Sequence, residues 1–293
     1  MTASVAGAYR ELTKPRLSFL ATLTAVAGFF LGDPKVVWSV SSLAALAVGT
    51  GMAAGACGAL NQFMERRPDA QMRRTETRPL PTGQLTPRAA FIFGSLLLIG
   101  GLFLVALGAN LIAAGLTALT AATYLLLYTP LKSRTGWCTV VGSLPGALPI
   151  LIGAAGRAPD GFPTPSAWLG FCALFAWQVP HFMALAVLWR DDYKRGGFKV
   201  ATVEDPTGES AARQSSAFLA LLAAALTAAL AYQAAHVLTW LIVTLTTVWY
   251  VVLGARFDNT ASRDATARPF FLFSLLHLPI TLLALVMDRI WHN

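Results

Sequence analysis

The chain has 293 residues, of which 56% are hydrophobic and only 12% are charged. This composition is too apolar for an ordinary soluble domain and predicts an integral membrane protein. The net charge of +8 does not indicate a nucleic-acid-binding protein, because the basic residues lie in short loops between apolar segments and form no basic face.

Nine segments are apolar enough to predict membrane-spanning helices, since a helix needs about 20 apolar residues to cross a bilayer. They are residues 17–32, 39–62, 89–107, 109–129, 137–156, 166–189, 214–234, 236–254 and 268–288, of which the first and fifth are the weakest. We therefore predict an all-α, polytopic membrane protein with one membrane-embedded domain over residues 1–293. The layout also predicts a pseudo-repeat, with spans one to four at about 15–130, spans five to eight at about 136–254, and a ninth span at about 268–288.

The basic residues are distributed unequally between the two sides of this layout. With the N-terminus in the cytoplasm, 19 of the 22 Lys and Arg residues fall on the cytoplasmic side, and only Lys35, Arg157 and Arg289 fall on the other. Cytoplasmic loops of membrane proteins carry such an excess of Lys and Arg. The sequence therefore predicts a cytoplasmic N-terminus and a C-terminus on the far side.

The most informative stretch interrupts the apolar pattern between the second and third spans. It reads NQFMERRPDAQMRRTETRPLPTG from Asn61 to Gly83. Asn61, Glu65 and Asp69 recur every four residues, so a helix would place their oxygens along one face. Such a row can hold a hard cation such as Mg²⁺, and the neighbouring arginines suit the charge of a bound phosphate group. The alternative is a loop that only marks the cytoplasmic side, but a topology signal needs no acids.

A second charged loop follows the sixth span on the same predicted side. It begins WRDDYKRGGFKV at Trp189. Asp191 and Asp192 are the natural partners of the first acidic row, because two acidic clusters from two halves of the chain could hold a metal-bound diphosphate between them. The alternative is that both aspartates pair with neighbouring Lys and Arg side chains as an interfacial cap.

The sixth span contains an ionisable side chain deep in the predicted membrane, within the sequence WQVPHF from Trp177 to Phe182. Pro180 frees a backbone carbonyl and kinks the helix. His181 beside it lies roughly 16 Å deeper than Asp192, at about 1.5 Å per residue. An intramembrane His is a functional candidate, and neutral imidazole is a common iron ligand. The alternative is a hydrogen bond to a neighbouring helix.

Two further regions are predicted to differ in their contribution to a site. The segment from Tyr128 to Gly156 places Lys132 on the cytoplasmic side, and its Gly and Pro residues predict that it lines a chamber. Residues 214–288 are predicted to contribute little beyond packing, with His277 more structural than catalytic.

The first 200 residues carry a set of stretches that belong together: ELTKPRLSFL from Glu11, the stretch from Asn61 to Gly83, YTPLKSRTGWCTVVG from Tyr128, WQVPHF and DDYKRGG. This set resembles the UbiA superfamily of intramembrane prenyltransferases. An Asn followed by two acids at four-residue steps is typical of the superfamily. WQVPHF, and the continuation Met72, Arg74, Thr75, Arg78, Pro79 and Leu80, resemble the branch that farnesylates heme.

The resemblance implies an all-helical bundle of nine spans around a central cavity open to lipid, with both acidic motifs over its cytoplasmic mouth. The implied reaction joins farnesyl diphosphate to a vinyl group of heme b, adds water and releases diphosphate, which gives heme O. The implied cofactor is Mg²⁺. The implied catalytic residues are Asn61, Glu65, Asp69, Asp191, Asp192 and Tyr193, and all of these except Tyr193 are also implied metal ligands. Arg74, Arg78 and Lys132 are implied to bind the diphosphate. His181 matches the family's histidine, for which heme contact is our hypothesis.

The resemblance also implies a bacterial cytoplasmic membrane as the location. The partners it implies are the lipid bilayer and heme A synthase or oxidase assembly factors, with no nucleic acid. Two alternatives remain open: a prenyltransferase that uses an aromatic or quinone precursor, which would share the metal site, and a heme or lipid transporter, which would have no use for two acidic motifs.

Three features depart from the family pattern. Cys138 stands where an Asn is usual, Ile150 stands where a second Pro is common, and the stretch after Tyr193 reads KRGGFKV and includes Lys199. These positions lie near the second motif and the fifth span. They therefore concern the shape of the acceptor pocket more than diphosphate binding.

Overall fold

The computed structural model describes residues 4–33, 35–259 and 263–291, and within these residues the secondary structure is helical, with no β-strand. The helices are α1 (Val5–Leu12), α2 (Pro15–Leu31), α3 (Val40–Asp69), α4 (Pro87–Gly108), α5 (Leu111–Ala122), the π-helical segment η1 (Thr123–Tyr128), α6 (Thr129–Leu131), α7 (Cys138–Arg157), α8 (Pro165–Leu188), α9 (Arg190–Arg195), α10 (Ala201–Glu204), α11 (Glu209–Tyr232), α12 (Val237–Asp258) and α13 (Arg263–Trp291). The prediction of an all-α fold is confirmed.

Each of the nine predicted membrane segments corresponds to a helix among the described residues, with ends that differ from the prediction by a few residues. Eight helical segments among the described residues are long and apolar enough to cross a membrane. The first predicted span is the shorter helix α2, whose 17 residues extend roughly 26 Å at about 1.5 Å per residue, against a hydrocarbon core of about 30 Å. The fifth span, also weak in the sequence, is the 20-residue helix α7, and 72% of its apolar window is buried inside the protein.

Several helices begin directly after a residue type that favours the start of a helix. Ser39, Thr86, Asn110 and Thr164 each accept a hydrogen bond from a backbone N–H three residues further on, at the starts of α3, α4, α5 and α8. Such side chains are favoured because the first N–H groups of a helix have no partner within it. A proline follows Thr86 and Thr164 at the first helical position, where the missing N–H costs nothing.

Helices α2 and α7 approach each other through glycines. A Cβ atom at Gly28 would lie 2.0 Å from the carbonyl oxygen of Ile150, and one at Gly153 would lie 1.8 Å from that of Ala25. Both distances are far inside van der Waals contact, so the two backbones can be this close only because these residues lack a side chain. The contact places α7 between α2 and α8, near the centre of the fold.

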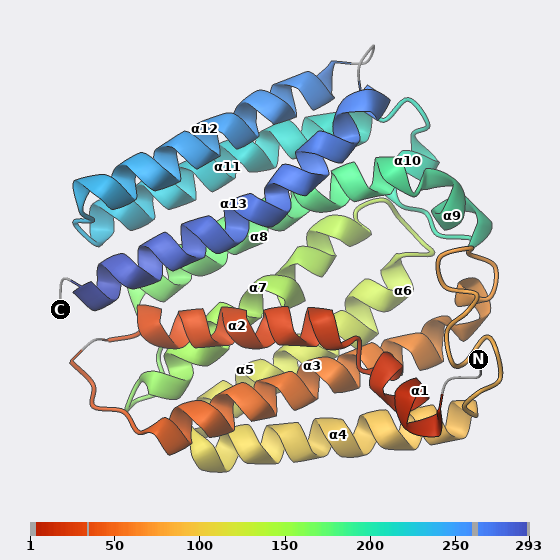
Figure 1. The fold of residues 1–293 in the computed structure, drawn as a ribbon, viewed down its shortest axis with the longest axis horizontal. Helices are drawn as coiled ribbons and strands as arrows, with labels where there is room; N and C mark the ends of the chain where they lie inside the picture. The colour runs from red at the N-terminus through yellow and green to blue at the C-terminus, as the bar shows by residue number, and fades with distance from the viewer. Residues whose placement is uncertain (1–3, 34, 260–262, 292–293) are drawn as a thin grey trace.

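The remaining helices surround this centre. In Figure 1, α3 runs beside α4, α11 packs between α8 and α12, and α13 packs against both α8 and α12. The short helices α1, α9 and α10 gather at one end of the bundle, on the right of the view, together with the segment that joins α3 to α4. The structure therefore places the segments that carry the two acidic motifs at the same end, and α13 ends at the opposite one.

Candidate active site

A cavity of about 570 Å³ lies between α2, α3, η1, α7, α8 and α13. Most of its wall is apolar, and Tyr124, Gln178 and His181 are among the polar exceptions. One end is different, because its lining is rich in charged and polar side chains: Lys14, Asn61, Glu65, Asp69, Arg74, Arg78, Lys132 and Tyr193. A cavity of this kind suits a ligand that has a charged head and a long apolar body.

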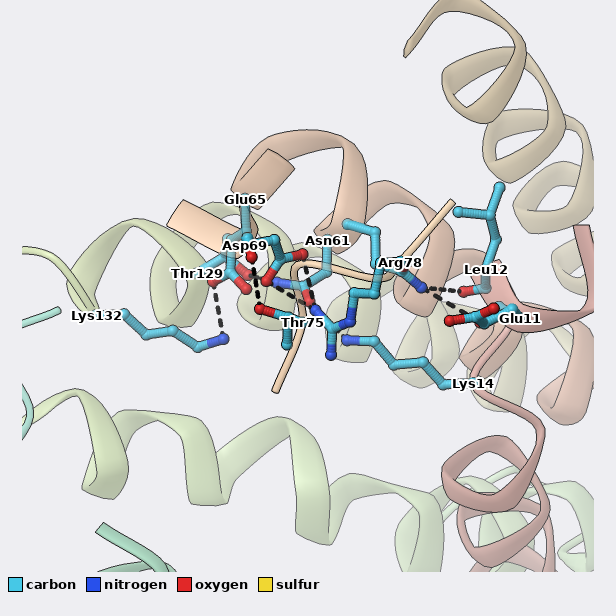
Figure 2. Close-up of polar contacts among 11 residues, drawn as sticks. Glu11, Leu12, Lys14, Asn61, Glu65, Asp69, Thr75, Arg78, Thr129 and Lys132 are labelled. Atoms are coloured by element: carbon cyan, nitrogen blue, oxygen red, sulfur yellow. Dashed lines mark hydrogen bonds and ion pairs between the residues drawn. The ribbon is translucent and has the colours of Figure 1, made fainter. Parts of the chain in front are cut away.

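The first acidic row lies on a single helix. Helix α3 continues to Asp69, beyond residue 62 where the second span was predicted to end. Asn61, Glu65 and Asp69 are all buried, with exposed fractions of 0%, 6% and 1%, and all three line the cavity. Figure 2 shows their side chains close together, facing a group of basic residues. The four-residue spacing therefore produces the shared face that it predicts.

Each member of this row contacts a cation from another part of the chain (Figure 2). These partners come from the start of α2, the loop after α3 and the segment after α6. The contacts are Lys14 Nζ to Asn61 Oδ1 at 2.7 Å, Lys132 Nζ to Glu65 Oε1 at 2.8 Å, and Arg78 Nη1 to the two oxygens of Asp69 at 2.7 and 2.8 Å. The two contacts of Arg78 with the buried Asp69 carboxylate are charge-assisted hydrogen bonds, and the contact of Lys132 with Glu65 is an ion pair.

Lys14 occupies an unusual position at the start of α2. Its φ is +47°, in the left-handed region that residues other than glycine seldom adopt. Burial, reinforced by the charges of Arg78 and Lys132, lowers the pKa of Lys14 to about 7. An anion bound in the cavity would favour the protonated form of this side chain, because an opposite charge nearby stabilises an ammonium group.

The second acidic motif is joined to the first by Arg74. The Arg74 N–H donates to Asp192 Oδ2 at 3.2 Å, and the guanidinium lies 5.8 Å from the centre of the Trp189 ring and 5.4 Å from that of Tyr193. Burial raises the pKa of Asp192, but hydrogen bonds from Arg74 and from Arg195 outweigh it, so the pKa is lowered. The carboxylate of Asp192 thus fixes the loop after α3 to α9.

The two aspartates of the second motif do not reach the cavity. Asp191 is exposed and Asp192 is buried beside the loop, and the cavity wall includes Tyr193 but neither aspartate. Among the described residues, no three His, Cys, Asp or Glu side chains are grouped closely enough to hold a metal ion. That both motifs supply ligands to one metal ion therefore stays a prediction.

The polar end nevertheless has the composition of a site for an anion and its metal ion. Four basic side chains and two carboxylates line it, which leaves two positive charges when all six are ionised. This excess attracts a diphosphate. The amide and carboxylate oxygens of Asn61, Glu65 and Asp69 are ligands that Mg²⁺ prefers.

Helices α8 and α13 form the part of the cavity wall around His181. Its Nδ1 lies 2.6 Å from Ser274 Oγ, and its ring stacks between Trp177, at 4.7 Å, and Phe271, at 4.9 Å. Phe271 and Leu275 of α13 also line the cavity. The expectation that residues 214–288 contribute little beyond packing is therefore wrong for α13, which supplies two side chains to the cavity wall and packs against α8 as well as α12.

Residues 21–276 match the UbiA prenyltransferase family. The chain belongs to the UbiA prenyltransferase family. The protoheme IX farnesyltransferase of Opitutus terrae is 41% identical to this UbiA chain, over 97% of the chain and 95% of the relative. A protein of the same name from Solibacter usitatus is 39% identical, over 96% of the chain and 98% of the relative.

Solved structures show the same fold as this UbiA protein. A digeranylgeranylglyceryl phosphate synthase superposes with a TM-score of 0.81 at 15% identity, covering 98% of this chain and 99% of that one. A UbiA homologue from Archaeoglobus fulgidus, bound to GPP and Mg²⁺, superposes with a TM-score of 0.68 at 19% identity, covering 95% of this chain and 99% of that one. The predicted helical bundle of the UbiA type is confirmed.

The three departures from the UbiA heme-branch pattern have different surroundings. Cys138 is buried at the start of α7 and lines the cavity. Ile150 is also buried, but it packs against α2 at Gly28 and does not line the cavity. Lys199 is exposed, and its N–H donates to the carbonyl oxygen of Lys132 at 2.7 Å. Two other residues of the same stretch, Phe198 and Val200, line the cavity. Cys138 and the stretch after Tyr193 therefore both change the wall of the cavity, and Ile150 does not.

Sequence reasoning missed three residues of the UbiA site: Lys14, Phe271 and Ser274. A signal existed for Lys14, since a Lys directly before a proline and an apolar segment stands at the mouth of a predicted span. Ser274 had no such signal, because a single serine in an apolar helix usually bonds only to its own backbone.

Proposed function

We propose that this protein transfers the farnesyl group of farnesyl diphosphate to a vinyl group of heme b, with addition of water, and forms heme O and diphosphate. The observation that carries the proposal is one cavity with a cationic, carboxylate-lined end and an apolar interior that reaches His181. Its support from comparison is the 39–41% identity, over nearly the whole chain, to proteins named protoheme IX farnesyltransferase.

The polar end binds the diphosphate and its metal ion. Asn61, Glu65 and Asp69 are the cavity residues that would hold Mg²⁺, which when bound supplies Lewis-acid stabilisation of phosphate charge. The Archaeoglobus fulgidus homologue, which binds GPP and Mg²⁺, supports this assignment. Asp192 contributes by holding Arg74 in place, because its carboxylate accepts a hydrogen bond from the Arg74 backbone N–H.

The basic side chains act on the leaving group. As the bond between farnesyl and diphosphate breaks, negative charge accumulates on the diphosphate oxygens. Arg74, Arg78 and Lys132 line the cavity where these oxygens would lie, so their contacts strengthen in the transition state. Loss of one such preorganised contact costs on the order of 3 kcal/mol of barrier.

The apolar interior holds the farnesyl chain and the porphyrin and keeps stray water from the allylic cation. Aromatic rings from two helices, Phe182 of α8 and Phe271 of α13, stand in its wall beside His181. Flat apolar surfaces of this kind match the faces of a macrocycle.

We place the polar end at the cytoplasmic face of a bacterial cytoplasmic membrane. The support is the charge distribution, in which 19 of the 22 Lys and Arg residues belong to segments on that side. The N-terminus then lies in the cytoplasm, and the polar end of the cavity faces the side from which the charged diphosphate group of farnesyl diphosphate can enter.

A transfer assay with two acceptors tests the proposal. Purified protein in lipid nanodiscs receives radiolabelled farnesyl diphosphate, Mg²⁺ and either heme b or 4-hydroxybenzoate. We expect label in heme only. Label in the benzoate would instead indicate the related prenyltransferase class. No transfer to either acceptor, together with movement of heme or lipid across the membrane of sealed proteoliposomes, would indicate a transporter.

A further inference from the structure

A hydrogen-bonded chain determines which ring nitrogen of His181 carries the proton. Nδ1 of His181 lies 2.6 Å from Ser274 Oγ, and the Ser274 hydroxyl donates to the carbonyl oxygen of Phe271 at 2.5 Å. A serine hydroxyl has one proton, and a carbonyl oxygen only accepts. Since that proton points to Phe271, Ser274 Oγ accepts a hydrogen bond from Nδ1–H. Neutral His181 therefore carries its lone pair on Nε2.

Three aromatic rings contact the His181 imidazole, and one of them, Phe182, lies 5.4 Å away and is tilted by 73° to it. Trp177 stacks on His181 with 20° between the ring planes, and Phe271 stacks on it with 29°. Within the part of the chain that the structure describes, no hydrogen bond to Nε2 is formed. Because His181 lines the cavity and both of its faces are covered, a substrate meets the ring at the edge that carries Nε2.

We propose that Ser274 is a positioning residue, which holds His181 in the Nδ1–H form so that Nε2 coordinates the iron of a porphyrin acceptor. This inference rests on the proposed function. Ser274 is fully buried and is not part of the cavity wall, so it acts through His181. Neutral imidazole is a good ligand for iron. A hydrogen bond at the other ring nitrogen orients the imidazole and raises its basicity.

The test compares Ser274→Ala with wild type and with His181→Ala in nanodiscs, by titration with heme followed in the Soret band and by the iron–histidine signature in resonance Raman spectra. Removal of such a supporting hydrogen bond lowers metal affinity by about 10- to 100-fold, and we expect this loss in Ser274→Ala with unchanged binding of farnesyl diphosphate. Ser274→Thr keeps a hydroxyl and should recover most of the affinity. Ser215→Ala is the matched control, because Ser215 is also buried and its hydroxyl donates, among the described residues, only to the Ala211 carbonyl.

A second measurement does not depend on heme. The ¹⁵N shifts of labelled histidine, with the His181 signals assigned by their absence in His181→Gln, report the tautomer directly, and we expect Nδ1–H in wild type and a mixture in Ser274→Ala. A proton on Nε2 in wild type would overturn the inference. An unchanged heme affinity and an unchanged spectrum in Ser274→Ala would also overturn the inference, even if transfer to heme were intact. Wild-type protein that neither binds nor farnesylates heme would overturn the proposed function, and the iron contact with it.

Discussion

Removal of the Lys132 ammonium group is the perturbation that best separates catalysis from folding at the polar end of the cavity. Lys132 Nζ lies 2.8 Å from Glu65 Oε1 and 4.6 Å from the centre of the Tyr128 ring. Burial alone would lower the pKa of Lys132, but the Glu65 carboxylate outweighs it and the pKa is raised, so the side chain is a cation at neutral pH. Lys132→Met keeps an unbranched apolar stem and removes the ammonium group.

Two effects of Lys132→Met have different magnitudes and different readouts. Loss of a contact to the developing diphosphate charge should raise the barrier by on the order of 3 kcal/mol, and so lower turnover by about 100-fold. The variant also leaves Glu65 buried without its partner, and breaking a buried ion pair costs about 3–5 kcal/mol of stability. The double variant Lys132→Met/Glu65→Gln removes both charges and should recover much of the stability but none of the turnover.

The assay measures farnesyl transfer to heme at saturating substrate, together with thermal unfolding, for each variant in nanodiscs. Lys35→Met is the matched control, since Lys35 is exposed and outside the cavity, and it should change neither quantity. Lys132→Arg keeps the charge and should lose less turnover than Lys132→Met. Turnover within threefold of wild type in well-folded Lys132→Met would refute the assignment of Lys132 to the diphosphate.

Three further outcomes are expected. Gly153→Ala should lower the free energy of unfolding by about 1–3 kcal/mol, because overpacking separates α2 from α7, whereas Gly115→Ala on α5 meets nothing within 4 Å and should not destabilise; equal melting of the two variants would contradict this packing. Hydrogen bonds from Thr207 and from the Ser210 N–H lower the pKa of Asp205 from its ordinary value of 3.8. The ionised Asp205 carboxylate therefore stabilises the start of α11 fully at pH values above 3.8, and this stabilisation is lost as the pH falls through the lowered pKa. Asp205→Asn should therefore speed hydrogen exchange at Ser210 at pH 7 but not at strongly acidic pH, and equal exchange at pH 7 would refute the role. Pyrophosphate should tighten Mg²⁺ binding in calorimetry, because it offers the cations now held by Glu65 and Asp69 another partner; Mg²⁺ affinity independent of pyrophosphate would exclude this coupling.

The parts of the fold that sequence alone could predict depend on short-range physics. Apolar length is sufficient to locate a membrane helix to within a few residues. The shared face of Asn61, Glu65 and Asp69 likewise needs only that one helix continues through them, which α3 does. Family membership followed from the same local motifs, and the match over residues 21–276 confirms it.

The parts that could not be predicted depend on contacts between distant segments. Nothing in the pattern around Asn61 indicates that Lys14, 47 positions earlier, donates to its amide oxygen. The contact between His181 and Ser274 spans 93 positions. Two rival interpretations of His181, a substrate contact and a hydrogen bond to a neighbouring helix, turn out to be compatible, because an imidazole has two nitrogens and α13 engages only one of them.

The pairing of acids with cations at the polar end explains how such a charged group can lie at the mouth of an apolar cavity. An unpaired carboxylate buried at Glu65 or Asp69 would cost several kcal/mol, and so would an unpaired cation at Lys132 or Arg78. The attraction within each ion pair offsets the desolvation cost of both side chains, so the paired site is stable without substrate. Diphosphate and a divalent cation together supply both signs of charge, and they can exchange with both sets of side chains at once. Diphosphate alone would draw the basic side chains away and leave the carboxylates unpaired, and the divalent cation alone would leave the basic side chains unpaired. We therefore expect diphosphate and the divalent cation to bind together.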